Sequence, residues 1–160
     1  MNAERMRADH FAELCGFYAD ERVMATLGGV RSPDATRMYL QAVIQHWEDH
    51  GFGFWIFHDA ATGELVGRGG LRRLEIEGTR EVEVAYAVVA DRWGQGFATE
   101  MAEAAVGAAF RNLKLASVVA FTLLANKASR GVMEKVGFSY EREIVYADQP
   151  HVLYRLTTNA

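Results

Sequence analysis

Residues 81–112 read EVEVAYAVVADRWGQGFATEMAEAAVGAAFRN, and this stretch decides the fold. Its first eight residues alternate in the two-residue period of a strand, and the next dozen contain a turn with Gly94 and Gly96. Good helix formers then dominate from Phe97 to Asn112. One face of the predicted strand carries Val82, Val84, Tyr86 and Val88, and the other carries Glu81, Glu83 and Ala85.

A helix that begins just after a glycine turn directs several unpaired N–H groups at one point, with the positive end of its dipole behind them. Such a helix start binds anions, most often phosphate. The plainer alternative is an ordinary strand–turn–helix connection whose glycines serve only the turn. Two known phosphate loops do not match, because G-x-x-x-x-G-K-[ST] is absent and Thr99 replaces the last glycine of G-x-G-x-x-G.

Length and composition limit the class of protein. At 160 residues the chain suits a single domain, residues 1–160, with a real core. Half of it is hydrophobic and 24% is charged, which is typical of a globular protein. The net charge of −4 gives no electrostatic footprint for nucleic acid or an anionic membrane. Because no apolar run resembles a signal core or a membrane span, we expect a soluble, cytoplasmic protein.

Thiol and metal chemistry are only weakly indicated. Cys15 is the single cysteine, so no internal disulfide can form, and it fits a small core residue better than a nucleophile. His46 and His50 are four residues apart, but the H-E-x-x-H pattern and a third ligand are missing. We therefore expect no metal site.

The rest of the chain predicts an α+β fold. We expect helices at 10–19, 33–49 and 126–137 and strands at 54–58, 64–74, 117–124, 138–146 and 151–157. The helix between the strands at 81–88 and 117–124 makes these two parallel, whereas the hairpins are antiparallel. The result is a mixed, mostly antiparallel twisted sheet flanked by helices, with one parallel pair whose diverging ends can admit a ligand.

The loop also resembles a known family. Residues 93–100, Trp-Gly-Gln-Gly-Phe-Ala-Thr-Glu, are similar to the acetyl-CoA loop of the GNAT superfamily, Q/R-x-x-G-x-G/A. Trp93 in place of Gln or Arg resembles the RimJ/RimL-type branch. Residues 126–138, with Asn126-Lys127-Ala128-Ser129 and a Glu-Lys-Val-Gly-Phe end, resemble the N-x-x-S…EK-x-GF segment. The branch usually opens with a TERLxLRP strand, of which only residues 3–7 remain, so we expect a short or displaced first strand.

The resemblance implies a GNAT fold that transfers acetyl from acetyl-CoA to a primary amine in a ternary complex, with pantetheine in the splay of the parallel pair. Backbone N–H groups of Gln95 to Thr99 would then hold the pyrophosphate, and an N–H at Val88 or Val89 would meet the thioester carbonyl. The implied cofactor-binding residues are Val88, Val89, Trp93, Gly94, Gln95, Gly96, Phe97, Ala98, Thr99, Asn126 and Ser129.

Glu83 is the first candidate for the base, since a partly buried carboxylate in mid-strand can accept the amine proton through water. A solvated strand glutamate is the alternative, and Glu81 is the reserve candidate. Many GNAT enzymes place a tyrosine acid where this chain has Met133, which cannot donate a proton. The resemblance suggests Ser129 instead, although hydrogen bonding at a helix start explains this serine equally well.

The sequence says least about the identity of the amine acceptor. The branch favours a peptide or protein N-terminus by analogy, and a small-molecule amine stays open. Arg68, Arg72 and Arg73 fit an acidic acceptor, the 3′-phosphate of CoA or a solvated face. The rival hypothesis is a GNAT fold that binds acyl-CoA as a sensor without transfer. A nucleotide-binding α/β domain is disfavoured by the absent lysine and the hairpins. Edge strands make a homodimer plausible.

Overall fold

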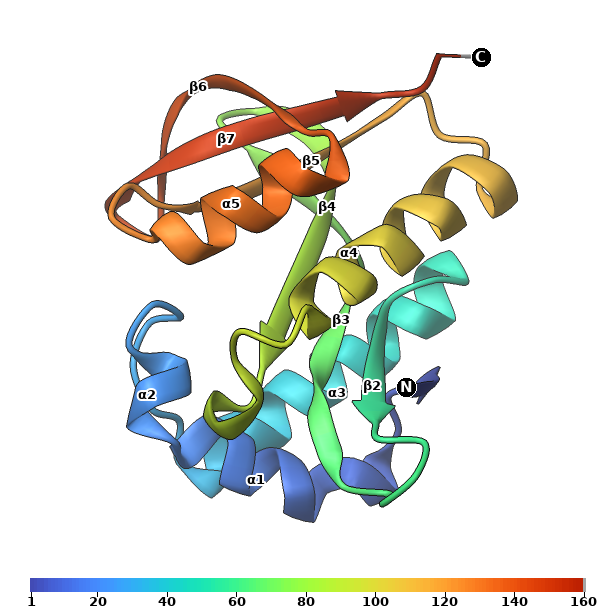
Figure 1. Cartoon of the computed structure of the whole chain (residues 1–160), viewed down its shortest axis with the longest axis vertical. Helices are drawn as coiled ribbons and strands as arrows, with labels where there is room; N and C mark the ends of the chain where they lie inside the picture. The colour runs from blue at the N-terminus through green and yellow to red at the C-terminus, as the bar shows by residue number, and fades with distance from the viewer. Residues whose placement is uncertain (160) are drawn as a thin grey trace. The chain divides into compact units, whose positions relative to one another are not determined.

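The computed structural model describes residues 1–159 and contains seven strands and five α-helices among them (Figure 1). The strands are β1 Asn2–Arg5, β2 Phe54–His58, β3 Leu65–Ile76, β4 Thr79–Val88, β5 Ser117–Leu123, β6 Ser139–Tyr146 and β7 Gln149–Thr157. The helices are α1 Phe11–Ala19, α2 Glu21–Met24, α3 Pro33–His50, α4 Phe97–Gly107 and α5 Lys127–Val136. The strand order β1-β2-β3-β4-β5-β7-β6 confirms the predicted mixed sheet.

Helix ends lie where the capping residues predict them. The Ser32 hydroxyl accepts the Ala35 N–H at 3.1 Å, with Pro33 at the first helical position of α3. Gly51, at a φ of +73°, ends α3, and Gly137, at +109°, ends α5. The last predicted turn of the central helix differs, because residues 108–112 form a π-helical turn after α4.

The packing of the chain divides it into two compact units. Unit 1 comprises residues 1–69 and 86–97, and unit 2 comprises residues 70–85 and the chain from Ala98 onward. Strands β3 and β4 contribute residues to both units. The single domain that length and composition predict therefore stays a prediction.

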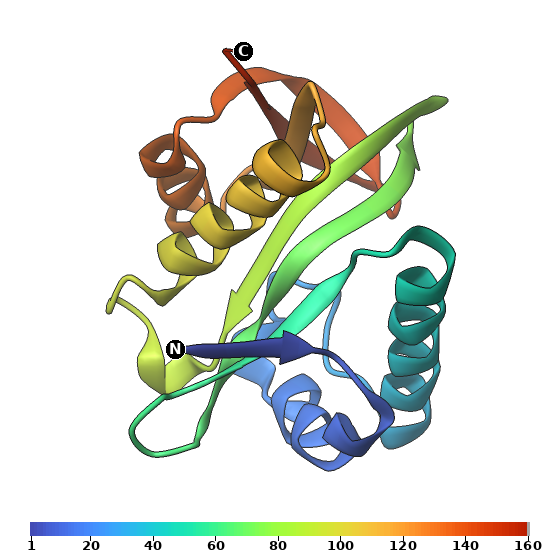
Figure 2. The ribbon, with the colours of Figure 1, turned by 90° about the vertical axis from the view of Figure 1, so that its right-hand side faces the viewer.

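Unit 1 contains the first strand, β1, which is four residues long and pairs antiparallel with β2 (dark blue arrow in Figure 2). The register runs from Asn2 opposite His58 to Arg5 opposite Trp55. Helix α1 packs against α3 and supplies the buried side chains Leu14, Phe17 and Tyr18. The first strand is thus present and short, as predicted, and it pairs with β2.

A cluster of arginine and tyrosine side chains lies inside unit 1. The Arg31 guanidinium lies 4.4 Å from the ring centroid of Tyr18 and 4.5 Å from that of Tyr39. Arg68 is buried, and its Nε donates to the Tyr18 hydroxyl at 2.9 Å. Arg68 therefore does not belong to a solvated strand face. The Tyr39 hydroxyl is also buried, but no hydrogen-bond partner is described for it, and burial raises the pKa of Tyr39.

We expect Tyr39→Phe to change stability little or to raise it by up to about 1 kcal/mol, because it removes a buried hydroxyl for which no hydrogen-bond partner is described, although burial and the nearby Tyr18 hydroxyl both raise the pKa of Tyr39. The matched control is Tyr18→Phe, which removes a hydroxyl that accepts from Arg68 and should destabilise by about 1–3 kcal/mol. Thermal unfolding of both variants, with shifts of roughly 2–4 °C per kcal/mol at this size, checks the pair. Equal losses in the two variants would contradict the expected difference.

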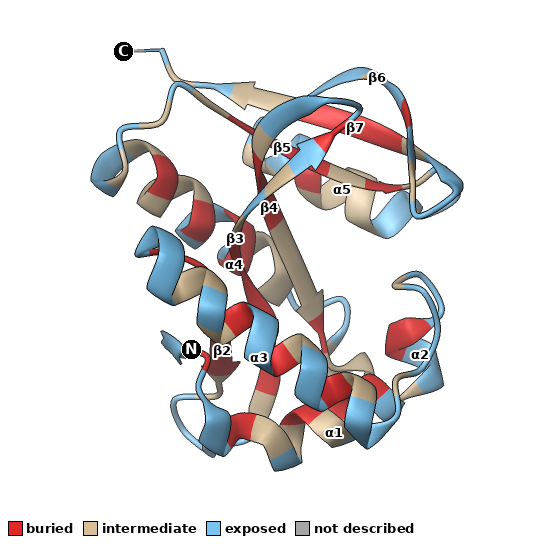
Figure 3. Cartoon of the chain, turned by 180° about the vertical axis from the view of Figure 1, so that it is seen from behind, coloured by how far each residue is buried: buried red, intermediate tan, exposed pale blue. Residues whose placement is uncertain are grey.

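Unit 2 contains the parallel pair of the sheet. Glu83 on β4 is the register partner of Val119 on β5, and the next residues on that face, Ala85 and Phe121, are not described as partners. The two strands therefore pair in parallel at Glu83, and the splay of their ends stays a prediction. On the other side β5 pairs antiparallel with β7, whose buried centre is red in Figure 3. Helix α5 packs against β5.

Candidate functional site

The glycine loop of residues 93–97 has the backbone geometry of an anion site. Gly94 and Gly96 adopt φ values of +75° and +84°, which L side chains rarely adopt. No hydrogen bond is described for the backbone N–H groups of Gly94, Gln95 and Gly96. Helix α4 follows directly, so the N–H groups of its first turn also lack partners within the helix. This arrangement of donors suits a phosphate or pyrophosphate group.

Two backbone groups before the loop already have partners in unit 1. The Val89 N–H donates to the Val66 carbonyl at 2.8 Å, so it is not available for a thioester carbonyl in this conformation. The N–H that would meet the thioester carbonyl, at Val88 or Val89, stays a prediction, and Val88 is the better candidate in this conformation. The Trp93 indole N–H donates to the Val88 carbonyl at 2.9 Å, which folds this half-exposed ring against the end of β4.

In unit 2, Asn126 and Ser129 meet at the start of α5. The Asn126 side chain accepts the Ser129 N–H at 3.2 Å and donates to the Thr122 hydroxyl at 3.0 Å. Asn126 is therefore the N-cap of α5, and its hydrogen bond to Thr122 joins the helix start to β5. Met133 is buried in the core, and its thioether has no proton to donate.

Glu83, the first candidate for the base, is 6% exposed, which is not the solvated strand glutamate of the alternative interpretation. Its Oε2 accepts from Nε of Arg72 at 2.9 Å and from Nη2 of Arg72 at 2.6 Å. Its Oε1 accepts no hydrogen bond from the groups that the structure describes. Burial opposes the charge of Arg72, but the neighbouring Glu83 and Tyr146 outweigh it and raise the pKa of Arg72.

Glu81, the reserve candidate, is held differently. Its two carboxylate oxygens accept from Arg155 at 2.7 and 3.1 Å, and Arg155 also donates to Glu141 and to the Ser117 hydroxyl. Both oxygens of Glu81 are therefore engaged in an ion-pair network that joins β4, β5, β6 and β7. Glu83 keeps one oxygen for an incoming proton, and this difference favours Glu83 as the base.

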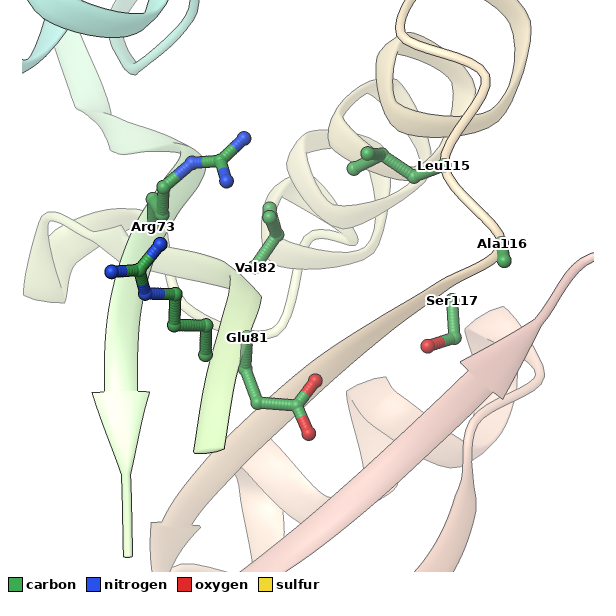
Figure 4. A pocket seen from close by; sticks show the side chains of 7 residues that line it. Arg73, Glu81, Val82, Leu115, Ala116 and Ser117 are labelled. Carbon is green, nitrogen blue, oxygen red and sulfur yellow. The ribbon is translucent and has the colours of Figure 1, made fainter. Parts of the chain in front are cut away.

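Glu81 also lines a hollow of about 210 Å³ in unit 2, between the starts of β4 and β5. Figure 4 shows Arg73 on β3, Glu81 on the neighbouring β4 and Ser117 at the start of β5. Its lining comprises Arg73, Arg80, Glu81, Val82, Leu115, Ala116 and Ser117. Since its only carboxylate is already paired with Arg155, this hollow offers no group that could act as a base.

The described residues, 1–159, also contain no candidate metal site. No group of three His, Cys, Asp or Glu side chains there could hold a metal ion. Nδ1 of His46 lies 2.9 Å from the Phe52 carbonyl oxygen, and the His46 ring stacks at a tilt on His50. None of the helices described combines the length and apolar character needed to cross a membrane.

Sequence reasoning missed two residues of this site, Arg72 as the partner of Glu83 and Tyr146 as the partner of Arg72. A signal for the first was present. Glu77 and Gly78 form the turn between β3 and β4, and Arg72 precedes Glu77 by the same five residues by which Glu83 follows Gly78. Counting from the turn would have placed the two side chains opposite each other. Tyr146 gave no such signal.

Comparisons with known proteins identify the family and the fold. The acetyltransferase (GNAT) domain family matches residues 3–139. The uncharacterized Bacillus subtilis protein YkkB is 29% identical over 137 residues, which cover 86% of this chain and 80% of that protein. The solved structure of an Agrobacterium tumefaciens acetyltransferase matches with a TM-score of 0.84 at 22% identity, over 98% of this chain and 90% of that one.

A second solved structure is RimL, named as a ribosomal L7/L12 alpha-N-protein acetyltransferase in complex with coenzyme A. It matches with a TM-score of 0.80 at 18% identity, over 99% of this chain and 94% of that one. Likeness at such low identity shows the fold alone, so the predicted fold is confirmed. The narrower RimJ/RimL-type branch stays a prediction.

Proposed function

The chain belongs to the GNAT acetyltransferase superfamily, and on that basis we propose that it transfers an acetyl group from acetyl-CoA directly to a primary amine. The observation that carries this proposal is the loop before α4, where glycines in left-handed conformations leave the N–H groups of Gly94, Gln95 and Gly96 without described partners. A side-chain cation is not needed for pyrophosphate there, because backbone donors and the helix start supply the positive potential.

The residues present fit acetyl-CoA. Its pyrophosphate matches the N–H donors of Gln95 to Thr99, and its amide groups match the polar start of α5 at Asn126 and Ser129. We propose that these groups hold it together with Val88, Trp93 and Gly94. Acetyl-CoA supplies the acetyl group as a thioester, which amines attack readily once they are neutral and held in position.

We propose that Glu83 accepts the proton of the acceptor amine, directly or through one water, at its Oε1 atom. Arg72 holds the other oxygen, so the direction in which the carboxylate presents Oε1 is fixed. The Val88 N–H would donate to the acyl oxygen, and the Ser129 hydroxyl would supply a proton to the departing sulfur. Met133 cannot supply it, because a thioether has no acidic proton, and the side chain is also buried.

For the acceptor we propose a peptide or protein N-terminus, with a small-molecule amine as the alternative. Support for the first comes from the loop motif and from the name of RimL, which acts on a protein α-amine. The fold does not decide between them, since one fold serves many acceptors. The cytoplasmic location and the homodimer stay predictions.

The first experiment measures thermal unfolding with acetyl-CoA, with ATP and NAD as controls. Acetyl-CoA at about one hundred times its dissociation constant should stabilise the protein by roughly 2.7 kcal/mol. At this size that raises the midpoint by about 5–10 °C. No rise, or a rise with ATP alone, would contradict the assignment of the loop.

The second experiment separates an enzyme from an acyl-CoA sensor. Release of free CoA thiol is followed with peptides of different N-terminal residues, a polyamine and an aminoglycoside as acceptors. An acceptor that accelerates release supports the enzyme and names its class. Stabilisation by acetyl-CoA without turnover on any acceptor would favour the sensor.

A further inference from the structure

Three polar side chains of unit 2 are linked by hydrogen bonds where β4 pairs with β5 at Glu83. Arg72 donates twice to Oε2 of Glu83, and its Nη2 also donates to the Tyr146 hydroxyl at 3.3 Å. Tyr146 is held in turn by edge-to-face contacts with Phe121 at 4.7 Å and His151 at 5.7 Å between ring centroids. The guanidinium is therefore fixed from the carboxylate side and from the hydroxyl side.

Because Glu83 is buried, its carboxylate needs a partner that compensates for the lost hydration. A carboxylate that is 6% exposed loses most of its hydration, which disfavours the ionised form unless a partner compensates. Among the described residues, Arg72 is the one cation bonded to it. Without Arg72 the buried carboxylate would lose its charge partner and the two hydrogen bonds that fix its orientation.

We propose that Arg72 is a positioning residue for acetyl transfer, which balances the buried charge of Glu83 and fixes its free oxygen toward the acceptor, with Tyr146 as the support that orients Arg72. The inference rests on the proposed function. Arg72 acts through Glu83 and needs no contact with the substrates. It replaces the expectation that burial alone prepares Glu83 as a base, because the two hydrogen bonds from Arg72 counter that burial.

The test compares Arg72→Met with Arg72→Lys and with the control Arg155→Met, using the best acceptor of the screen. We expect Arg72→Met to lower kcat/KM about 10- to 100-fold at pH 7 and to move the acid limb of the pH–rate profile upward by about one to three pH units. Activity should recover in part at pH 9. Arg72→Lys keeps the charge and should restore most of the acid limb, and Tyr146→Phe should have a smaller effect in the same direction.

Arg155→Met breaks the ion pair of Glu81, two residues before Glu83 on the same strand, so it controls for general damage to the sheet. We expect it to lower stability without moving the acid limb. A uniform loss of activity in Arg72→Met with an unmoved acid limb would overturn the proposal, as would an equal shift in Arg155→Met.

Unfolding provides a readout that needs no turnover. A buried unpaired carboxyl group favours the folded state when protonated, and this stability is lost as pH rises. The stability difference between wild type and Arg72→Met should therefore grow from pH 5 to pH 8, and in a Glu83→Gln background this growth should vanish. A pH-independent difference would overturn the proposal. If unfolding behaves as expected but no acceptor is acetylated, the proposed function fails, and the positioning role of Arg72 in acetyl transfer fails with it.

Discussion

Glu83→Gln is expected to lower kcat by about 10²- to 10⁴-fold, which is the usual contribution of a positioned general base. The amide keeps the size of the side chain and can still accept from Arg72, so the sheet should stay intact. It cannot take a proton from an amine. The affinity for acetyl-CoA, measured by its effect on thermal unfolding, should stay within a factor of two or so, because the proposed cofactor contacts are backbone groups of the loop.

The matched control for this prediction is Glu81→Gln on the same strand. Its carboxylate already binds Arg155 through both oxygens, so we expect a cost in stability and little change in kcat. If Glu83→Gln leaves turnover unaffected, Glu83 is not the general base. A large loss of kcat in Glu81→Gln alone would move the assignment to the reserve candidate.

Local rules predicted most of the fold from the sequence, because the residues that end each element act on their immediate neighbours. Ser32 and Gly51 bound α3, and Gly137 ends α5, through hydrogen bonds and backbone angles that span only a few residues. The π-helical turn of residues 108–112 was not predictable in this way, since no local signal distinguishes it from the last turn of an α-helix.

The candidate site was predictable only where its chemistry belongs to the backbone. The loop of residues 93–97 can be recognised from its glycines, because left-handed backbone angles disfavour most other residues. The state of Glu83 depends on Arg72 and Tyr146, which come from other strands. Counting residues from the turn between β3 and β4 predicts that Arg72 lies opposite Glu83. Tyr146 lies far along the chain, and its position follows from the pairing of β6 with β7, which tertiary packing decides.

Gly96→Ala is expected to abolish most of the stabilisation by acetyl-CoA while costing the free protein only about 1–2 kcal/mol. Gly96 has a φ of +84°, and a Cβ there would meet no atom within 4 Å, so the obstacle is the backbone angle. Alanine favours a negative φ, and the turn that directs the N–H groups of the loop would change with it. Because those groups are the proposed pyrophosphate donors, their reorientation should lower the affinity at least tenfold.

Gly63→Ala provides the matched control for this substitution. Gly63 lies in the turn before β3 with a φ of +75°, and a Cβ there also meets no atom within 4 Å. Its cost in stability should therefore be similar to that of Gly96→Ala, but the midpoint should still rise by about 5–10 °C with acetyl-CoA. Thermal unfolding of both variants, each with and without acetyl-CoA, distinguishes backbone strain from the loss of an anion site. An undiminished rise in Gly96→Ala would mean that the pyrophosphate is held elsewhere, and the loop would then be an ordinary turn between β4 and α4.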